Sequence, residues 1–191
     1  MAKIDSELGR FISHWQVRIP VGADVASDDD FRKYVSGVAI GNGVYSLFPK
    51  TEHEKWRRLI GELFPRFGNK VEPVGHDWLG RLFVLDQTGG EDDGCTLLLD
   101  PCTGDRFVIP AGFREFHGCV LVDQIEEALD AAAFAAWSKE NGPLTANQCV
   151  GFKTPLVLGG KANPSNYEVA DVEIYWALLS QITLQVRGPW Y

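Results

Sequence analysis

Four short segments rich in β-forming residues follow one another between residues 70 and 110, and they constrain the fold more than any other feature of the sequence. They are KVEPVG (70–75), RLFVLD (81–86), CTLLLD (95–100) and DRFVIP (105–110). The connector PCTG is a tight turn, and QTGGEDDG is a longer polar loop. This succession predicts an antiparallel meander.

Amphipathic segments ahead of the meander predict helices that cover it. Residues 4–16 place apolar side chains at helical spacing. Ser27 begins a second short helix, whose first-turn acids complement the helix dipole. Thr51 and Glu54 form a capping-box pattern before a third helix, which Pro65 ends. Between the second and third helices, an Asn-Gly turn signal predicts a hairpin.

The segment QIEEALDAAAFAAWSKE predicts one continuous helix after the meander, with a capping pattern of Asp123 and Glu126 at its start. On this helix Phe134 points away from the apolar face, toward Glu127 and Asp130. An apolar ring within an acidic face predicts a second contact surface. The contact is either with another part of this protein or with a partner.

The C-terminal segment 169–184 is apolar on nearly every side, which predicts a buried core helix. We therefore expect an α+β fold, with a mixed or antiparallel sheet flanked by helices and compact enough to form a single unit. Any domain division would fall near Gly142-Pro143, which separates residues 1–141 from residues 142–191.

The negative charge of the chain is concentrated in its middle. The net charge of −8 comes from 26 acidic and 18 basic residues, and residues 87–140 alone supply the whole imbalance with eleven acids against three bases. Such a block repels phosphate backbones, which argues against direct binding of nucleic acid. The same field would attract a basic partner and speed its association.

The sequence gives no sign of export, membrane insertion or disulfide bonding. No segment approaches the roughly 18 consecutive apolar residues that cross a bilayer, and no apolar signal-peptide core follows the N-terminal charge. Four cysteines are few for 191 residues, and their spacing indicates free thiols. We therefore expect a cytoplasmic protein.

The run LVLGGKA is the strongest match to a phosphate-binding loop. The Walker pattern needs a further glycine five residues earlier and a hydroxyl residue after the lysine, but Ala162 stands at that position. A turn at Gly159-Gly160 with positive φ is the favoured interpretation. The segment EDDG lacks the alternating ligands of a calcium loop, so it is either a solvated loop or a docking site for a basic protein.

Cys95, Cys102, His117 and Cys119 are the nearest approach to a zinc site, but their spacing matches no zinc module. Cysteines in apolar runs such as CTLLL and GCVLV, which we interpret as strands, are usually small core residues. A nucleophilic pair of Cys119 with His117, at i and i+2 on such a strand, remains an alternative, although no GxSxG elbow accompanies it. We expect no catalytic residue, metal or cofactor.

Residues 142–182 resemble the C-terminal domain of type VI secretion DNase immunity proteins, a DUF1851-type domain often found beside a GAD-like N-terminal domain. The segments WLGRLFVLD, LLLDPCTGDRFVIP and FREFHG also resemble the broader SMI1/KNR4-like immunity proteins. The positions of residues 142–182 that match the immunity-protein pattern are Gly142, Pro143, Leu144, Gly151, Phe152, Pro155, Leu158, Gly159, Gly160, Asn166, Glu173, Leu178, Leu179 and Gln181.

The resemblance implies an immunity protein, not an enzyme, that binds and neutralises a cognate DNase toxin by covering its basic surface. Residues 1–141 would then be a GAD-like or SMI1/KNR4-like region, and residues 142–191 the immunity segment. The alternatives are an SMI1/KNR4-like scaffold or a small-ligand-binding module without a toxin partner. The residues that we predict to contact the toxin come from the acidic block: Glu91, Asp92, Asp93, Glu127, Asp130 and Phe134.

Overall fold

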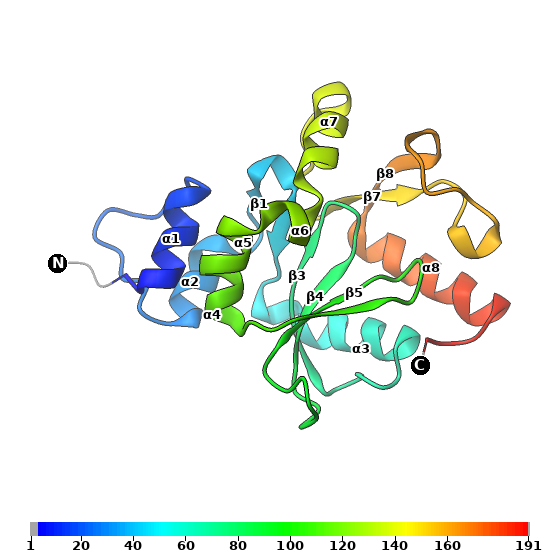
Figure 1. Cartoon of the computed structure of the whole chain (residues 1–191), viewed down its shortest axis with the longest axis horizontal. Coiled ribbons are helices and arrows are strands. Elements are labelled where there is room, and N and C mark those ends of the chain that lie inside the picture. The colour runs from blue at the N-terminus through cyan, green and yellow to red at the C-terminus, as the bar shows by residue number, and fades with distance from the viewer. Residues whose placement is uncertain (1–3, 191) are drawn as a thin grey trace.

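The segments predicted as a meander form the centre of a six-stranded sheet (Figure 1). The computed structural model describes residues 4–190, so Tyr191 of the predicted C-terminal segment lies outside it. Strand order follows chain order, and all neighbouring strands are antiparallel, which confirms the α+β prediction. The strands are β1 (Ala39–Ile40), β2 (Tyr45–Leu47), β3 (Val71–Asp77), β4 (Leu82–Asp86), β5 (Thr96–Leu99) and β6 (Arg106–Ile109).

Helices flank this sheet. The predicted helices at residues 4–16 and after Ser27 are confirmed, and Ser27 forms a capping box with Asp30. The α-helices are α1 (Ser6–His14), α2 (Asp28–Val35), α3 (His53–Leu63), α4 (Phe113–Glu115), α5 (Leu121–Asp123), α6 (Ile125–Leu129), α7 (Ala131–Asn141) and α8 (Val172–Val186). Between α4 and α5 lies the π-helical turn η3 (Phe116–Val120), and 3₁₀ turns are η1 (Gly41–Gly43), η2 (Lys50–Glu52), η4 (Leu156–Leu158) and η5 (Pro164–Asn166).

Both faces of the sheet are buried at β4 and β5, because successive apolar residues of these strands point to opposite faces and each set meets its own helices. On β4, Phe83 belongs to a core that includes α1, α2 and η3, whereas Leu82 and Val84 belong to a core that includes α3 and α8. On β5, Leu98 and Leu97 divide between the same two cores. The sheet is therefore the middle layer of three.

A second sheet, which the sequence did not predict, pairs β7 (Gln148–Phe152) with β8 (Tyr167–Asp171). The Val150 N–H donates to the carbonyl of Trp78 over 2.6 Å, which joins β7 to the β3–β4 turn. Between β7 and β8, Gly159 has a φ of 87°, and a Cβ on Gly160 would lie 1.8 Å from the Thr154 carbonyl oxygen. The expected glycine turn is confirmed.

The predicted continuous helix over 124–140 is wrong, because the chain breaks at Asp130, whose φ is 54°. The Trp78 indole N–H donates to the Leu129 carbonyl over 2.9 Å, and the Glu126 carboxylate accepts from the Ala132 N–H. These two side chains take the place of backbone hydrogen bonds that a continuous helix would make between α6 and α7. The predicted cap at Asp123 is also wrong, because its carboxylate instead pairs with Arg10.

Three further expectations need correction. The helix after Pro49 begins as the 3₁₀ turn η2, and no side chain caps it, so Thr51 forms no capping box. The segment GCVLV is helical, within η3 and α5, where a strand was expected. Helix α8 is buried on one side only, because Ile174 and Leu178 are exposed.

Candidate partner-binding site

The three predicted loop acids lie on the β4–β5 connection, but not all of them are free to meet a partner. Asp92 Oδ2 accepts a hydrogen bond from Arg106 Nη1 over 2.9 Å, and Asp93 Oδ1 accepts from the Gly89 N–H over the same distance. Glu91 and Asp93 are exposed, whereas Asp92 is half-buried. The Asp92 carboxylate therefore has an internal role, which fixes the loop against β6.

The predicted helix residues divide in the same way. Glu127 and Asp130 are exposed on and after α6. Phe134 is only 4% exposed, and its ring lies 5.6 Å from that of Trp78 and 6.2 Å from that of Trp137. The sequence left open whether Phe134 contacts another part of this protein or a partner, and in the structure it packs on this protein's own Trp78 and Trp137. A partner anchor must therefore be sought among exposed side chains.

The two acidic segments do not form one patch. The hydrogen bond from Trp78 to Leu129 places α6 at the β3–β4 turn. The loop of residues 87–95 follows the opposite end of β4. In Figure 1 that loop lies at the lower edge of the molecule, whereas α6 lies higher, below α7. The charge block of the sequence is thus divided between two surfaces.

A groove of about 320 Å³ runs between β6 and the α5–α6 helices. Its walls are mainly apolar, and Phe107 and Val108 of β6 are 53% and 40% exposed. Glu127 lines the same groove. The lining residues are Arg81, Leu98, Phe107, Val108, Ile109, Pro110, Val120, Gln124, Glu127 and Ala128. A predicted contact residue therefore borders an exposed apolar surface that the sequence reasoning missed.

Phe107 and Val108 were missed because the segment DRFVIP was interpreted only as a strand. As the last strand of a meander, it is expected to lie at the sheet edge, where apolar side chains lack a neighbouring strand. That position was the signal available in the sequence. The groove also needs the α5–α6 turn as its second wall, and no local pattern places that turn.

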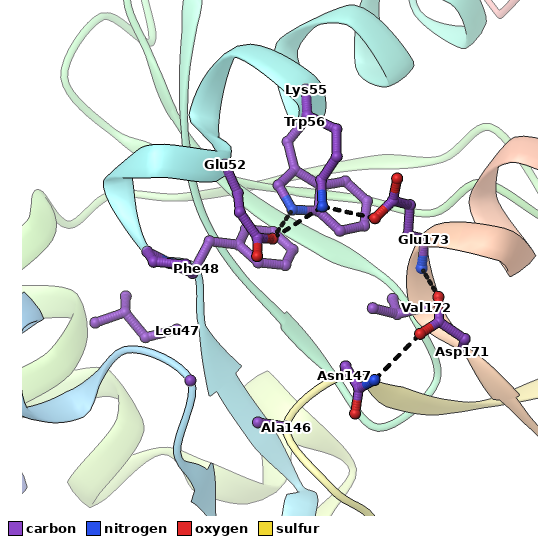
Figure 2. A pocket seen from close by; sticks show the side chains of 12 residues that line it. Leu47, Phe48, Glu52, Lys55, Trp56, Ala146, Asn147, Asp171, Val172 and Glu173 are labelled. Atoms are coloured by element: carbon purple, nitrogen blue, oxygen red, sulfur yellow. Dashed lines mark hydrogen bonds and ion pairs between the residues drawn. The ribbon is translucent and has the colours of Figure 1, made fainter.

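A second cleft, of about 380 Å³, lies between α3 and the start of α8 (Figure 2). Lys55 Nζ contacts Glu52 Oε2 over 3.1 Å and Glu173 Oε2 over 2.6 Å, which links the two helices. Asp171 caps α8 and also accepts from Asn147. These carboxylates all have partners within the protein, so the arrangement clamps helices together and offers no free acid–base pair.

The clamp favours the charged form of Lys55. Burial opposes that form, but the hydrogen bonds to Glu173 and Glu52 outweigh it and raise the pKa of Lys55. We expect Lys55→Met to lower the free energy of unfolding by about 0.5–1 kcal/mol, because the pair is partly exposed. Urea denaturation in low and high salt measures this. Lys50→Met, which removes the exposed pair with Asp29, is the control, and an equal loss in both would contradict the clamp.

The alternative nucleophilic pair does not form. His117 is buried, with Nδ1 bonded to the Phe113 carbonyl over 2.7 Å and Nε2 to the Tyr45 hydroxyl over 2.9 Å. Burial lowers the pKa of His117 to about 3. Cys119 instead contacts Arg10, with 3.5 Å between Sγ and Nη1. Helical geometry separates the two side chains that a strand would have placed on one face.

The cysteines of the other proposed cluster are also dispersed. Within residues 4–190, no three His, Cys, Asp or Glu side chains lie close enough together to hold a metal ion. Cys102 is buried beside the Tyr175 hydroxyl, and burial raises its pKa to about 12.

Over the same residues, no helix combines the length and apolarity that crossing a membrane requires.

Comparison with known proteins gives two findings. Residues 116–183, from η3 into α8, match the family described as "T6SS immunity protein Tdi1, C-terminal". The structure is similar to one described as "Crystal structure of Atu4351 from Agrobacterium tumefaciens", with a TM-score of 0.59 and 18% identity over 94% of this chain and 82% of that one. No curated sequence matches significantly. Over residues 116–183 the chain is thus similar to immunity proteins of type VI secretion systems, and over most of its length it shares the fold of the Agrobacterium protein.

Proposed function

We propose that the protein is an immunity protein that binds and neutralises a cognate effector of a type VI secretion system. The similarity of residues 116–183 to the Tdi1 family carries this proposal. The immunity function then needs only a stable complex, because occlusion of a toxin requires no bond to be made or broken. The partner surfaces described above are compatible with that task.

The effector is proposed to be a nuclease with a basic surface. A nuclease holds DNA through lysine and arginine side chains, so an acidic protein competes for the same groups. The exposed acids of the two surfaces support this choice: Glu91 and Asp93 on the loop, and Glu127 and Asp130 on and after α6. Binding takes place in the cytoplasm, where an incoming nuclease meets DNA. The same proposal assigns residues 1–141 to a GAD-like or SMI1/KNR4-like region and residues 142–191 to the immunity segment.

The direct experiment is coexpression with a candidate type VI effector, chosen from the genes that adjoin the one for this protein. Wild-type protein is expected to restore growth, to copurify with the effector as a complex and to abolish its cleavage of plasmid DNA. A protein that neither binds nor protects overturns the immunity proposal. A complex with an effector that degrades another substrate retains immunity and removes the nuclease assignment.

Charge reversal tests the proposed contact acids. Glu91→Lys and Glu127→Lys change exposed side chains on the two separate acidic surfaces. We expect the variant on the contact surface to slow association several-fold in low salt, with a smaller effect in high salt, because rim charges act mainly on encounter rates. Stopped-flow association with the purified effector measures this. Equal, unchanged rates for both variants would remove both surfaces from the contact.

A further inference from the structure

The outer edge of β6 is open to another strand. β6 is the last strand of the sheet and, within residues 4–190, pairs only with β5. The Asp100 N–H donates to the Asp105 carbonyl, which makes these two residues a hydrogen-bonded pair. Hydrogen-bonded and non-hydrogen-bonded pairs alternate along an antiparallel ladder. Phe107 therefore also forms a hydrogen-bonded pair with β5, whereas the backbone N–H and C=O groups of Arg106 and Val108 point away from β5.

The groove beside this edge provides side-chain contacts for an added strand. Phe107 lies opposite Leu98 and therefore on the face of the sheet that α5 and α6 cover in part. Its ring is 53% exposed and lines the groove with Val120 and Ala128. An aromatic side chain in a largely apolar groove is typical of the residues that dominate binding energy. A strand paired with β6 would place alternate side chains in this groove.

The charges around the groove favour a basic segment. The one arginine that lines it, Arg81, is paired with Asp77 at 2.5 Å, and Arg106 on β6 is paired with Asp92. The Glu127 carboxylate on the rim is exposed and has no hydrogen-bond or ion-pair partner among the side chains and backbone groups of residues 4–190. The uncompensated charge is therefore negative. A second copy of the chain would bring its own acids to this edge, which disfavours β6 pairing with itself.

We propose that an extended segment of the effector, with an apolar side chain and a neighbouring lysine or arginine, adds to β6 as an edge strand. Its backbone bonds to Arg106 and Val108, the apolar side chain packs on Phe107, and the cation meets Glu127. This inference rests on the proposed function, because it names the surface through which the effector is bound.

Two variants test the two parts of this contact. Val108→Pro removes an outward N–H and leaves the bonds to β5 intact, which edge strands tolerate. Phe107→Ala removes the exposed ring. Each is expected to weaken binding of the purified effector, measured by calorimetry, by about ten-fold or more. Ile174→Ala, on the exposed side of α8, is the matched control and is expected to keep wild-type affinity. Unchanged melting temperatures show that the variants fold.

The outcomes separate this inference from the proposed function. If wild-type protein binds the effector and both β6 variants bind equally well, the edge-strand contact is overturned and immunity stands. If wild-type protein does not bind the effector, the proposed function itself fails. A dimer of the free wild-type protein that Val108→Pro dissociates, measured by light scattering, would assign the edge to a second copy and also overturn the inference.

Discussion

Lowering the pH from 7 to 5 is expected to destabilise the protein by about 2 kcal/mol through His117 alone. Burial lowers the pKa of this imidazole to about 3, whereas an unfolded histidine titrates near 6.5. The unfolded chain therefore takes up a proton that the folded protein excludes. The contribution of neutral His117 to the free energy of unfolding is fully present above pH 6.5. It is lost as the pH falls toward 3, by about 1.4 kcal/mol per pH unit.

The hydrogen bonds of His117 explain why the neutral form is retained. The Phe113 carbonyl accepts from Nδ1–H, so Nε2 is left to accept from the Tyr45 hydroxyl. A proton on Nε2 would turn this nitrogen into a donor and leave the Tyr45 O–H without its acceptor in a fully buried site. Burial also lowers the pKa of His53, to about 4, which adds a second contribution of the same sign.

Urea denaturation at pH 7, 6 and 5 measures this effect. His117→Gln is expected to be less stable than wild type at pH 7 but to lose about half of the pH dependence, because His53 supplies the rest. His14→Gln changes an exposed histidine and should keep the wild-type profile. A wild-type slope in His117→Gln would show that another group controls the acid transition.

The sequence predicted the meander because its strands are specified locally. Leu82, Phe83 and Val84 alternate between two cores, and short polar connections separate them from their neighbours. Long-range contacts decided the parts that were wrong. The α6–α7 break at Asp130 depends on the Trp78 indole, which comes from a turn some fifty residues earlier. No periodicity within the helix can report such a bond.

The candidate site shows the same division between local and distant information. Glu127 and Phe134 lie on one predicted helix, and counting along it gave them similar roles. The break at Asp130 turns Phe134 toward Trp78 and leaves Glu127 on the groove. The acids of the 87–95 loop and those of α6 also lie apart, because they are near opposite ends of strand β4. Charge in a sequence block therefore did not predict charge in a surface patch.

Arg81→Met is expected to lower the free energy of unfolding by about 3–5 kcal/mol, the largest effect of any substitution considered for this chain. Asp77 is 0% exposed, and its Oδ2 contacts Arg81 Nε at 2.5 Å. Removing the guanidinium leaves a carboxylate buried without a counter-charge. Only the N–H groups of Leu79 and Arg81, at 3.0 and 2.9 Å from Oδ1, would remain to stabilise it.

The pH dependence of Arg81→Met has the opposite sign to that of His117. Burial raises the pKa of Asp77, so the folded protein binds a proton more readily than the unfolded chain does. As the pH falls through that raised range, protonation relieves the buried charge and the variant recovers part of its deficit. Chemical denaturation of Arg81→Met and Asp77→Asn/Arg81→Met measures this, and the double variant should be the more stable at pH 7.

Arg106→Met provides the matched control, because its partner Asp92 is partly exposed and a loss below about 1 kcal/mol is expected. An equal loss in both variants would contradict the role of burial. The Asp77–Arg81 pair also fixes the β3–β4 turn, whose Trp78 holds the α6 wall of the β6 groove through Leu129. Arg81→Met loosens that turn, so it should weaken effector binding more than Arg106→Met does. This loss would be indirect, because neither arginine is expected to be an anchor of the contact.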